Sequence, residues 1–190
     1  MIAFVKYKYV KSGDHDSIIF SQDRIGKNGK MIKIYKFRSM VPNAEKILDE
    51  LMEKDPKIKE EYLTNKKLVN DPRITPVGNF LRKTSLDEWP QFINVLMGNM
   101  SVIGPRPHML LHTEEYSKLI DKYMIRHFCK PGITGWAQVT GFRGETKELW
   151  QMEGRIERDI WYIENWSPWL DLKIIFMTIK NIIIPDGHAY

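Results

Sequence analysis

The chain has 190 residues, of which 43% are hydrophobic and 28% charged. This composition is typical of a folded globular protein and excludes a chain that is disordered throughout. The net charge of +5 favours anionic partners such as nucleotides, phospholipid head groups or nucleic acid, without choosing among them. The single cysteine, Cys129, excludes an internal disulfide, and we interpret its side chain as a small structural hydrophobe.

The first predicted element is a β-hairpin within residues 18–40. Asn28-Gly29 is a strong turn signal between two short strands. The second strand, Met31–Arg38, alternates apolar and basic residues, which indicates one buried and one solvated face. The alternation is imperfect, so we expect Lys36 and Arg38 to project from the end of the strand into a site.

Helices dominate the rest of the chain. Asn43 is placed to cap a charged helix over 43–62, and Pro56 is expected to end or kink that helix. The pattern then predicts two helices within 78–97 with a break at Lys83–Ser85, a helix at 113–127, a short strand at Trp136–Val139, and helices at 145–164 and 168–183. We therefore predict an α+β fold: one mostly helical domain over residues 1–190 with a small hairpin or sheet and amphipathic interfacial helices.

The last predicted helix begins with a capping serine, Ser167, and a proline at its first helical position. It carries an apolar stripe at helical spacing: Trp169, Leu172, Ile175, Phe176 and Ile179. Such a stripe most often packs into a core. Three tryptophans close to its start, however, favour an interfacial surface. No segment has the ~20 consecutive apolar residues that a membrane-spanning helix needs.

The acidic pair Asp87–Glu88 is the strongest candidate for chemistry. Ser85 and Glu88 have the spacing of a capping box, so both acids could simply favour the start of a helix. A carboxylate at such a position also stays ionised, and it could ligate Mg²⁺ or attack phosphorus. Neighbouring helical residues point about 100° apart, so the two acids are expected to have different roles.

Several basic residues are candidates for phosphate contacts. Arg106 lies between two prolines, which restrict the local backbone and suit a preorganised guanidinium. Arg82, Lys36 and Arg143 are further candidates. No P-loop or glycine-rich dinucleotide motif is present, so nothing in the sequence supports classical ATP or NAD binding. The histidines have no spacing typical of a metal site or a triad, and we interpret them as structural: His108, His112 and His127.

Ordered motifs along the chain resemble those of the bacterial sugar transferase family, the monotopic polyprenyl-phosphate phosphoglycosyl transferases. The resemblance extends from about Phe20 to Tyr190. The motifs that carry it are Arg24-Ile25-Gly26, Tyr35-Lys36-Phe37-Arg38-Ser39-Met40, Asp71-Pro72-Arg73-Ile74-Thr75-Pro76-Val77-Gly78, Leu81-Arg82-Lys83-Thr84-Ser85-Leu86-Asp87-Glu88, Met100-Ser101-Val102-Ile103-Gly104-Pro105-Arg106-Pro107 and Pro131-Gly132-Ile133-Thr134-Gly135-Trp136-Ala137-Gln138-Val139.

The resemblance implies a reaction in which a UDP-sugar gives its sugar-1-phosphate to undecaprenyl phosphate and UMP is released. It implies that Asp87 is the nucleophile and a Mg²⁺ ligand, that a phosphosugar–aspartyl intermediate forms, and that Glu88 is the partner acid. The substrate-binding residues that it implies are Lys36, Arg38, Arg82, Arg106, Arg143 and Asp159.

The motif Gly141–Thr146, together with Asp159–Ser167, is similar to the glucose-1-phosphate transferase branch, so UDP-glucose is the first choice of donor and UDP-galactose the second. The family implies residence at the inner face of the bacterial cytoplasmic membrane, a role in exopolysaccharide, capsule or O-antigen assembly, and possible homo-oligomers. Most of the family's re-entrant membrane helix is missing before Phe20, so this chain is expected to be soluble or peripheral. The alternatives are a non-catalytic membrane-surface scaffold and a nucleic-acid-binding protein. The second has only the basic charge in its favour, so we expect no nucleic-acid partner.

Overall fold

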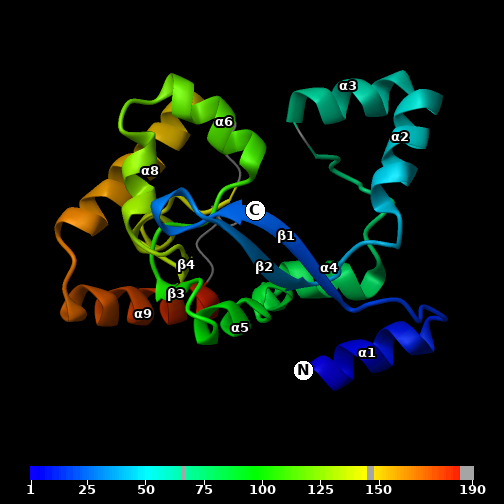
Figure 1. Ribbon diagram of the computed structural model, residues 1–190. Coiled ribbons are helices and arrows are strands. Elements are labelled where there is room, and N and C mark those ends of the chain that lie inside the picture. Colours follow the sequence, from blue (N-terminus) through cyan, green and yellow to red (C-terminus); the bar gives the residue numbers. More distant parts are fainter. Residues whose placement is uncertain (66, 145–147, 185–190) are drawn as a thin grey trace. The chain divides into compact units, whose positions relative to one another are not determined.

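The computed structural model describes residues 1–65, 67–144 and 148–184 (Figure 1). Its backbone forms two compact units. The first consists of Met1–Phe20 and Tyr35–Pro90, and the second of Ser21–Ile34 and Gln91–Tyr190. The fold is the predicted mostly helical α+β class. A single domain over the whole chain stays a prediction.

The predicted hairpin is confirmed. Strand β1 spans Ile19–Ile25 and strand β2 spans Met31–Phe37, and the two pair in one sheet. A 3-10 turn, η1 (Lys27–Gly29), joins them, with Asn28 and Gly29 both at positive φ. This backbone conformation is the one for which an Asn-Gly pair is suited.

In the first unit, the described residues form four α-helices and one 3-10 turn. They are α1 (Ile2–Lys11), α2 (Ala44–Lys54), α3 (Pro56–Asn65), α4 (Pro76–Lys83) and η2 (Leu86–Glu88). The core of this unit joins α1, β2 and α4 through four buried side chains: Val5, Tyr9, Phe37 and Leu81. The end of β2 is therefore fixed between two helices.

The break predicted at Pro56 is confirmed, because α2 ends at Lys54 and α3 begins at Pro56. The predicted capping role of Asn43 is wrong. Asn43 does precede α2, but it has a φ of 56° and makes no side-chain capping bond. The helix is held instead by its buried Leu48, an example of tertiary packing outweighing a local signal.

The second unit holds the remaining elements. They are α5 (Gln91–Leu96), β3 (Ser101–Ile103), α6 (Leu110–Leu119), η3 (Tyr123–Phe128), β4 (Gly132–Thr134), α7 (Trp136–Val139), α8 (Leu149–Glu164) and α9 (Pro168–Ile183). Strands β3 and β4 pair in parallel, with Ser101 opposite Gly132 and Ile103 opposite Thr134. Two apolar clusters lie in this unit, one around Ile174 and one around Met152.

Two predictions about this unit are wrong. The expected helix at 113–127 is divided into α6 and η3, because Lys122 takes a left-handed conformation with a φ of 64° between them. The expected strand at Trp136–Val139 is a short helix, α7, and the strand β4 lies just before it. Gly135 separates the two, and its backbone lies too close to that of Gly104 for a Cβ atom to fit.

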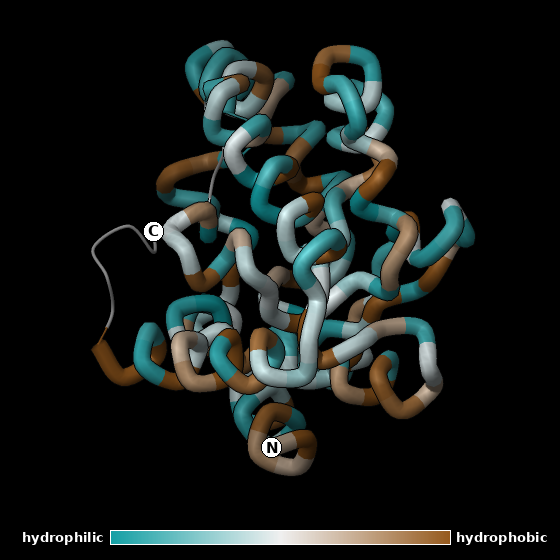
Figure 2. Tube along the Cα trace, turned by 90° about the vertical axis from the view of Figure 1, so that its left-hand side faces the viewer, coloured by the Kyte–Doolittle hydropathy of each residue, from teal (hydrophilic) through white to brown (hydrophobic). Residues whose placement is uncertain are grey.

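Helix α9 begins as predicted, since the Ser167 hydroxyl accepts a hydrogen bond from the Leu170 amide. Its buried side consists of Leu170 and Ile174. Four residues of the apolar stripe are exposed, most of all Trp169 at 79% and Phe176 at 69%. The fifth, Ile175, packs against the core of its unit. Figure 2 shows the same apolar character at the start of α1 and in the last described residues of the chain. Across the described ranges, no helix combines the length and hydropathy needed to cross a bilayer.

Candidate active site

The acidic pair lies on η2 rather than at the start of an α-helix. Ser85 has a φ of 56° and makes no side-chain capping bond, so the predicted capping box of Ser85 and Glu88 is wrong. The α-helix that follows begins only at Gln91, after Pro90. Because η2 is a single 3-10 turn, the helix dipole supplies no strong argument for an ionised Asp87. Asp87 and Glu88 are both half-buried on this turn.

Glu88 forms an ion pair with Lys36 of β2. The Lys36 Nζ atom lies 2.8 Å from Glu88 Oε1, and the two side chains are 21% and 15% exposed. The predicted projection of Lys36 from the end of its strand is thus confirmed. The neighbouring Phe37 is buried in the core, which holds the strand in place while Lys36 turns toward the acid.

Arg82 is held by the segment that follows β2. Its Nε atom donates a hydrogen bond of 2.9 Å to the Ser39 hydroxyl. The Ser39 carbonyl accepts a bond of 3.0 Å from the Thr75 amide, directly before α4. Gly78 in α4 packs against the same carbonyl so closely that a Cβ atom would lie 1.8 Å from its oxygen. A short contact therefore fixes α4, and with it Arg82, against Ser39.

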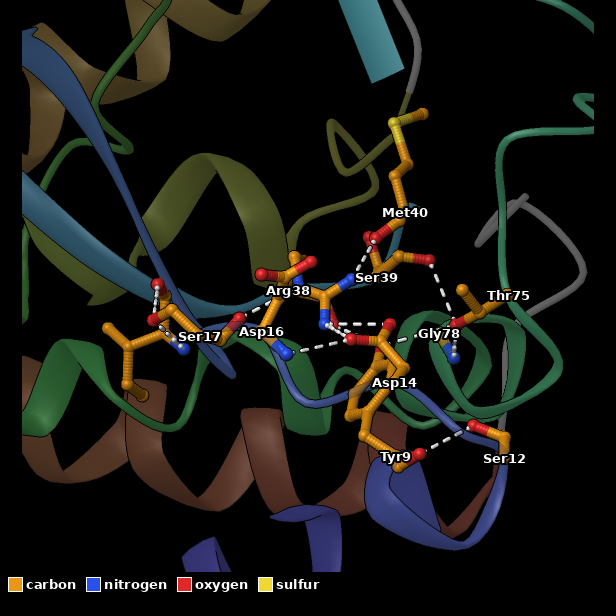
Figure 3. Close-up of polar contacts among 11 residues, drawn as sticks. Tyr9, Ser12, Asp14, Asp16, Ser17, Arg38, Ser39, Met40, Thr75 and Gly78 are labelled. Carbon is orange, nitrogen blue, oxygen red and sulfur yellow. Dashed lines mark hydrogen bonds and ion pairs between the residues drawn. The ribbon is translucent and has the colours of Figure 1, made fainter. Parts of the chain in front are cut away.

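The guanidinium of Arg38 is directed at the protein itself (Figure 3). Its Nη2 atom donates to both carboxylate oxygens of Asp14, at 2.8 and 2.9 Å. Its Nε atom donates to the Ser17 carbonyl at 2.7 Å and its Nη1 atom to the Met40 carbonyl at 2.9 Å. The guanidinium carbon also lies 4.6 Å from the centre of the Tyr9 ring. The contacts of Arg38 thus join α1 to the end of β2, and its predicted substrate contact stays a prediction.

In the second unit, Arg106 lies in the loop after β3. Gly104 and Pro105 are buried, whereas Arg106 is half-buried. The Arg106 carbonyl accepts a hydrogen bond of 2.6 Å from Nη2 of the buried Arg126. Gly104 passes the backbone of Gly132 so closely that a Cβ atom on Gly132 would lie 2.2 Å from the Gly104 nitrogen. The path of this loop is therefore set by backbone contacts and by Arg126.

Asp159 lies beneath this loop in a buried cluster of charges. Its Oδ2 atom is 2.8 Å from Arg126 Nη2, and both side chains are almost fully buried. Burial raises the pKa of Asp159 to about 6, against the opposing effect of Arg126 and Arg155. Burial also lowers the pKa of Arg155 to about 10. His108 contacts Arg126 and Tyr123, and burial, reinforced by Arg126, holds its pKa well below the ordinary value.

His127 and Cys129 line a small hollow below the same loop, together with Arg106 and Arg126. Burial and then the charge of Arg126 lower the pKa of His127 to about 4, so the ring is neutral at pH 7. Burial raises the pKa of the Cys129 thiol to about 11. A protonated thiol is a poor nucleophile, which agrees with the structural interpretation of this cysteine.

Arg143 lies in a turn between two glycines of positive φ, Gly141 and Gly144. The Gly144 carbonyl accepts a hydrogen bond of 3.0 Å from Arg155 Nη2, which links this turn to the buried cluster. The end of the predicted motif, Glu145-Thr146, lies outside the described residues.

The structure thus gathers the predicted residues in two groups. The first unit holds Asp87, Glu88, Lys36, Arg38 and Arg82, and the second holds Arg106, Arg143 and Asp159. Sequence reasoning missed the residues that hold these groups. In the first unit they are Tyr9, Asp14 and Ser39, and in the second Arg126 and Arg155. Ser39 could have been found from its place between Arg38 and Met40 in a quoted motif, whereas a lone arginine such as Arg126 carries no local signal.

The acidic pair also limits the kind of metal site that is possible. Among the residues that the structure describes, no group of three or more His, Cys, Asp or Glu side chains could enclose an ion. Mg²⁺ usually retains several waters and takes one or two carboxylates plus the phosphates of a substrate. Asp87, half-buried on its turn, fits that second arrangement and not a cage made by protein alone.

A carboxylate on the same turn as an acid that is paired with lysine suits chemistry on phosphorylated substrates, because a carboxylate can attack or bind metal and cations can offset charge. Comparison with known proteins narrows this class. The chain matches the profile of the bacterial sugar transferase family over residues 1–185 and belongs to that family.

The chain is similar to UDP-glucose:undecaprenyl-phosphate glucose-1-phosphate transferases from Escherichia coli (strain K12), at 52% identity, and from Klebsiella pneumoniae, at 54%. Each alignment covers 90% of this chain and 33% of the relative. It is also 42% identical to the undecaprenyl-phosphate galactose phosphotransferase of Salmonella typhimurium (strain LT2), over 98% of this chain and 37% of the relative. The chain therefore spans about a third of the length of these curated relatives.

Proposed function

We propose that this protein transfers a sugar-1-phosphate from a UDP-sugar to undecaprenyl phosphate and releases UMP. The observation that carries the proposal is the placement of Asp87 and Glu88 in a chain of the bacterial sugar transferase family. Glu88 lies on the same half-buried turn as Asp87 and is paired with Lys36 of β2. Arg82 is fixed by Ser39 five residues before Asp87. Phosphoryl transfer depends mainly on such positioning and on charge stabilisation.

In the proposed mechanism, a carboxylate oxygen of Asp87 attacks the phosphorus that carries the sugar. The bond from that phosphorus to the oxygen of UMP breaks, and UMP leaves with the electron pair. A phosphate oxygen of the lipid then attacks the same phosphorus, and the bond to Asp87 breaks. This second step regenerates the carboxylate and gives the lipid diphosphate sugar. Arg82 and, in the second unit, Arg106 are proposed to bind phosphate oxygens of the substrates.

Mg²⁺ is proposed to be held by Asp87 together with the pyrophosphate of the donor, where it would neutralise negative charge during the transfer. Glu88 does not fit the role of an independent metal ligand equally well, because its carboxylate is already paired with the Lys36 ammonium at 2.8 Å. The ion pair instead suits a supporting role in which Glu88 and Lys36 hold the turn that presents Asp87.

The proposed donor is UDP-glucose, with UDP-galactose second. The support comes from relatives: those named for glucose-1-phosphate transfer are 52% and 54% identical to this chain, and the one named for galactose is 42% identical. We further propose that the protein works at the cytoplasmic face of the membrane. The exposed stripe of α9, with Trp169 and Phe176, is the kind of apolar surface that lies in a membrane interface.

The decisive experiment is a UMP-release assay with undecaprenyl phosphate, a panel of UDP-sugars, and Mg²⁺ present or removed by chelation. We expect release that needs Mg²⁺ and is fastest with UDP-glucose. Incubation with donor alone should add one sugar phosphate to the peptide that contains Asp87, detectable by mass spectrometry.

Asp87→Asn should abolish both the label and the turnover. Asp49→Asn is the matched control, since Asp49 is an exposed carboxylate of the same unit, on helix α2. Normal turnover of Asp87→Asn would refute the nucleophile. Vesicle binding without any UMP release by the wild type would favour a non-catalytic scaffold instead.

A further inference from the structure

The contacts of Arg38 connect the end of α1 with the Ser39–Met40 segment, which is bonded in turn to Thr75 at the start of α4 (Figure 3). On one side, Arg38 contacts α1 and the residues that follow it. Its side chain pairs with Asp14 and lies over the Tyr9 ring, and its backbone carbonyl accepts a hydrogen bond from the Tyr9 hydroxyl. Asp14 lies three residues after the end of α1, and Tyr9 is almost fully buried within it. The seat of α1 therefore depends on the Arg38 side chain.

On the other side, Arg38 encloses Ser39. Its Nη1 atom reaches past Ser39 to donate to the Met40 carbonyl at 2.9 Å. The same peptide segment is anchored at its start, because the Arg38 amide donates to the Ile18 carbonyl at 2.8 Å. Ser39 thus lies between two anchored residues, Arg38 and Met40. These anchors do not involve the hydroxyl or the carbonyl of Ser39, which remain available for contacts with α4.

Both polar groups of Ser39 are directed at α4. The carbonyl accepts the bond from the Thr75 amide, and the hydroxyl accepts the bond from Arg82 Nε. The Thr75 hydroxyl, which accepts from the Gly78 amide to cap α4, also lies 3.1 Å from the Tyr9 hydroxyl. Ser39 and Tyr9 therefore fix the beginning of α4 and the arginine in its last turn.

The end of α4 continues directly into the turn that bears the acids. The Ser85 amide donates to the Arg82 carbonyl at 3.1 Å, and the Trp89 amide donates to the Leu86 carbonyl at 3.2 Å. Leu86 also packs against the core of the first unit. Arg82 and Asp87 are thus joined by a short, hydrogen-bonded segment, and a shift of Arg82 would move Asp87 as well.

We propose that Arg38, Asp14 and Tyr9 are positioning residues, which set the place of Arg82 and of the Asp87–Glu88 turn through Ser39. The kinetic test of this inference rests on the proposed function, because it measures the release of UMP. In this proposal Arg38 does not bind substrate directly, because its guanidinium donates hydrogen bonds to Asp14, Ser17 and Met40. The seating of α1 thereby becomes a determinant of the geometry of the acidic pair.

The test compares Arg38→Lys with Arg73→Lys. Lysine keeps the positive charge but cannot reach Asp14, Ser17 and Met40 at once, because it lacks the planar fork. Arg73 is a matched control: it is buried in the same unit, it pairs with Asp71 at 2.6 Å, and its side chain bonds the Ala44 carbonyl rather than the Ser39 segment. Both variants lose comparable contacts, so general loss of stability affects them alike.

For Arg38→Lys we expect kcat for UMP release to fall at least about tenfold, because a displacement of roughly 1 Å can cost a hundredfold in rate. The KM for the UDP-sugar should stay within about threefold. Asp14→Asn should show the same loss, and Asp14→Glu should restore part of it. Arg73→Lys should keep its kcat at temperatures where it is fully folded. A kcat of Arg38→Lys equal to that of Arg73→Lys, or a change in KM alone, would overturn the inference.

Hydrogen exchange supplies a measurement that does not depend on activity. The amides of Ser85, Glu88 and Trp89 should exchange about tenfold faster in Arg38→Lys, since their local opening becomes easier, and should be unchanged in Arg73→Lys. Equal exchange in both variants would refute the positioning role. If the wild type releases no UMP while these exchange rates differ as expected, the proposed function fails and the positioning role stands. If Arg38→Lys does not fold, Tyr9→Phe, which removes one hydroxyl, provides the same comparison.

Discussion

Gly78→Ala is the most direct test of how the first unit holds its site. Glycine lies inside α4, where alanine is normally preferred by about 1 kcal/mol. Local propensity alone therefore predicts a more stable protein. The packing predicts the opposite, because the new Cβ atom would lie 1.8 Å from the Ser39 carbonyl oxygen and 2.6 Å from its Cα atom.

The size of the effect follows from what must move. Real Cβ contacts below 3.0 Å are essentially never seen, so α4 and the Ser39 segment must separate by more than an ångström. The bonds from the Thr75 amide and from Arg82 to Ser39 would lengthen beyond use. Each contributes about 0.5–1.5 kcal/mol, and overpacking of backbone adds about 1–3 kcal/mol. After the gain of about 1 kcal/mol in helix propensity, we expect a net loss of about 3 kcal/mol, within a range of about 1–5 kcal/mol.

Urea unfolding monitored by tryptophan fluorescence would measure this loss, and UMP release would report the accompanying displacement of Arg82. Gly13→Ala is the matched control in the same unit. Gly13 has a φ of 81°, yet a Cβ atom there would meet nothing within 4 Å, so its cost is limited to backbone strain of about 1–2 kcal/mol. A Gly78→Ala protein as stable as the wild type would show that α4 is not fixed against Ser39 as described.

Three further predictions concern other parts of the molecule. Lys36→Met removes the cation 2.8 Å from Glu88, so UMP release at saturating donor should fall about tenfold or more. The melting temperature should also fall, because the two side chains are only 21% and 15% exposed and Glu88 loses this partner for a largely buried charge; full activity would contradict the role given to this pair. The lowered pKa of His127 contributes stability that is present above about pH 6.5 and lost as the pH falls toward 4. The difference in unfolding free energy between the wild type and His127→Gln should therefore shrink by up to about 3 kcal/mol over that range, and a pH-independent difference would show that the folded state does not disfavour the charged ring. Replacing both Trp169 and Phe176 with serine should weaken binding to vesicles of anionic phospholipid by at least about a hundredfold, since burial of each exposed ring in the interface would contribute about 1.5–3 kcal/mol; unchanged binding would exclude this face of α9 as the contact.

The sequence predicted the elements whose signals are local and strong. The Asn28-Gly29 hairpin, the division at Pro56 and the capped start of α9 all depend on residues with special backbone conformations or a missing amide. The acidic pair and Lys36 were also predicted as site residues, and the structure brings Lys36 to Glu88.

The errors occurred where tertiary contacts outweigh local patterns. Ser85 and Glu88 have the spacing of a capping box, but Glu88 pairs with Lys36 from a distant strand, and Ser85 takes a left-handed turn. Arg38 shows a related limit: the alternation along its strand could not reveal that its guanidinium pairs with Asp14, 24 residues away in sequence, and its substrate contact stays a prediction. A single sequence shows the charge of each residue but not the partner that chain folding provides.

The close crossing of Gly104 with Gly132 and Gly135 determines which substitutions this part of the chain can accept. At this point main chain touches main chain, and a Cβ atom on Gly104, Gly132 or Gly135 would lie 2.2–2.5 Å from backbone oxygen or nitrogen. The path of the loop that carries Arg106 is thus set by contacts between backbone atoms. Substitution of the side chains around this crossing can therefore change what the loop contacts without changing its path, whereas a side chain at any of the three glycines would displace the backbone.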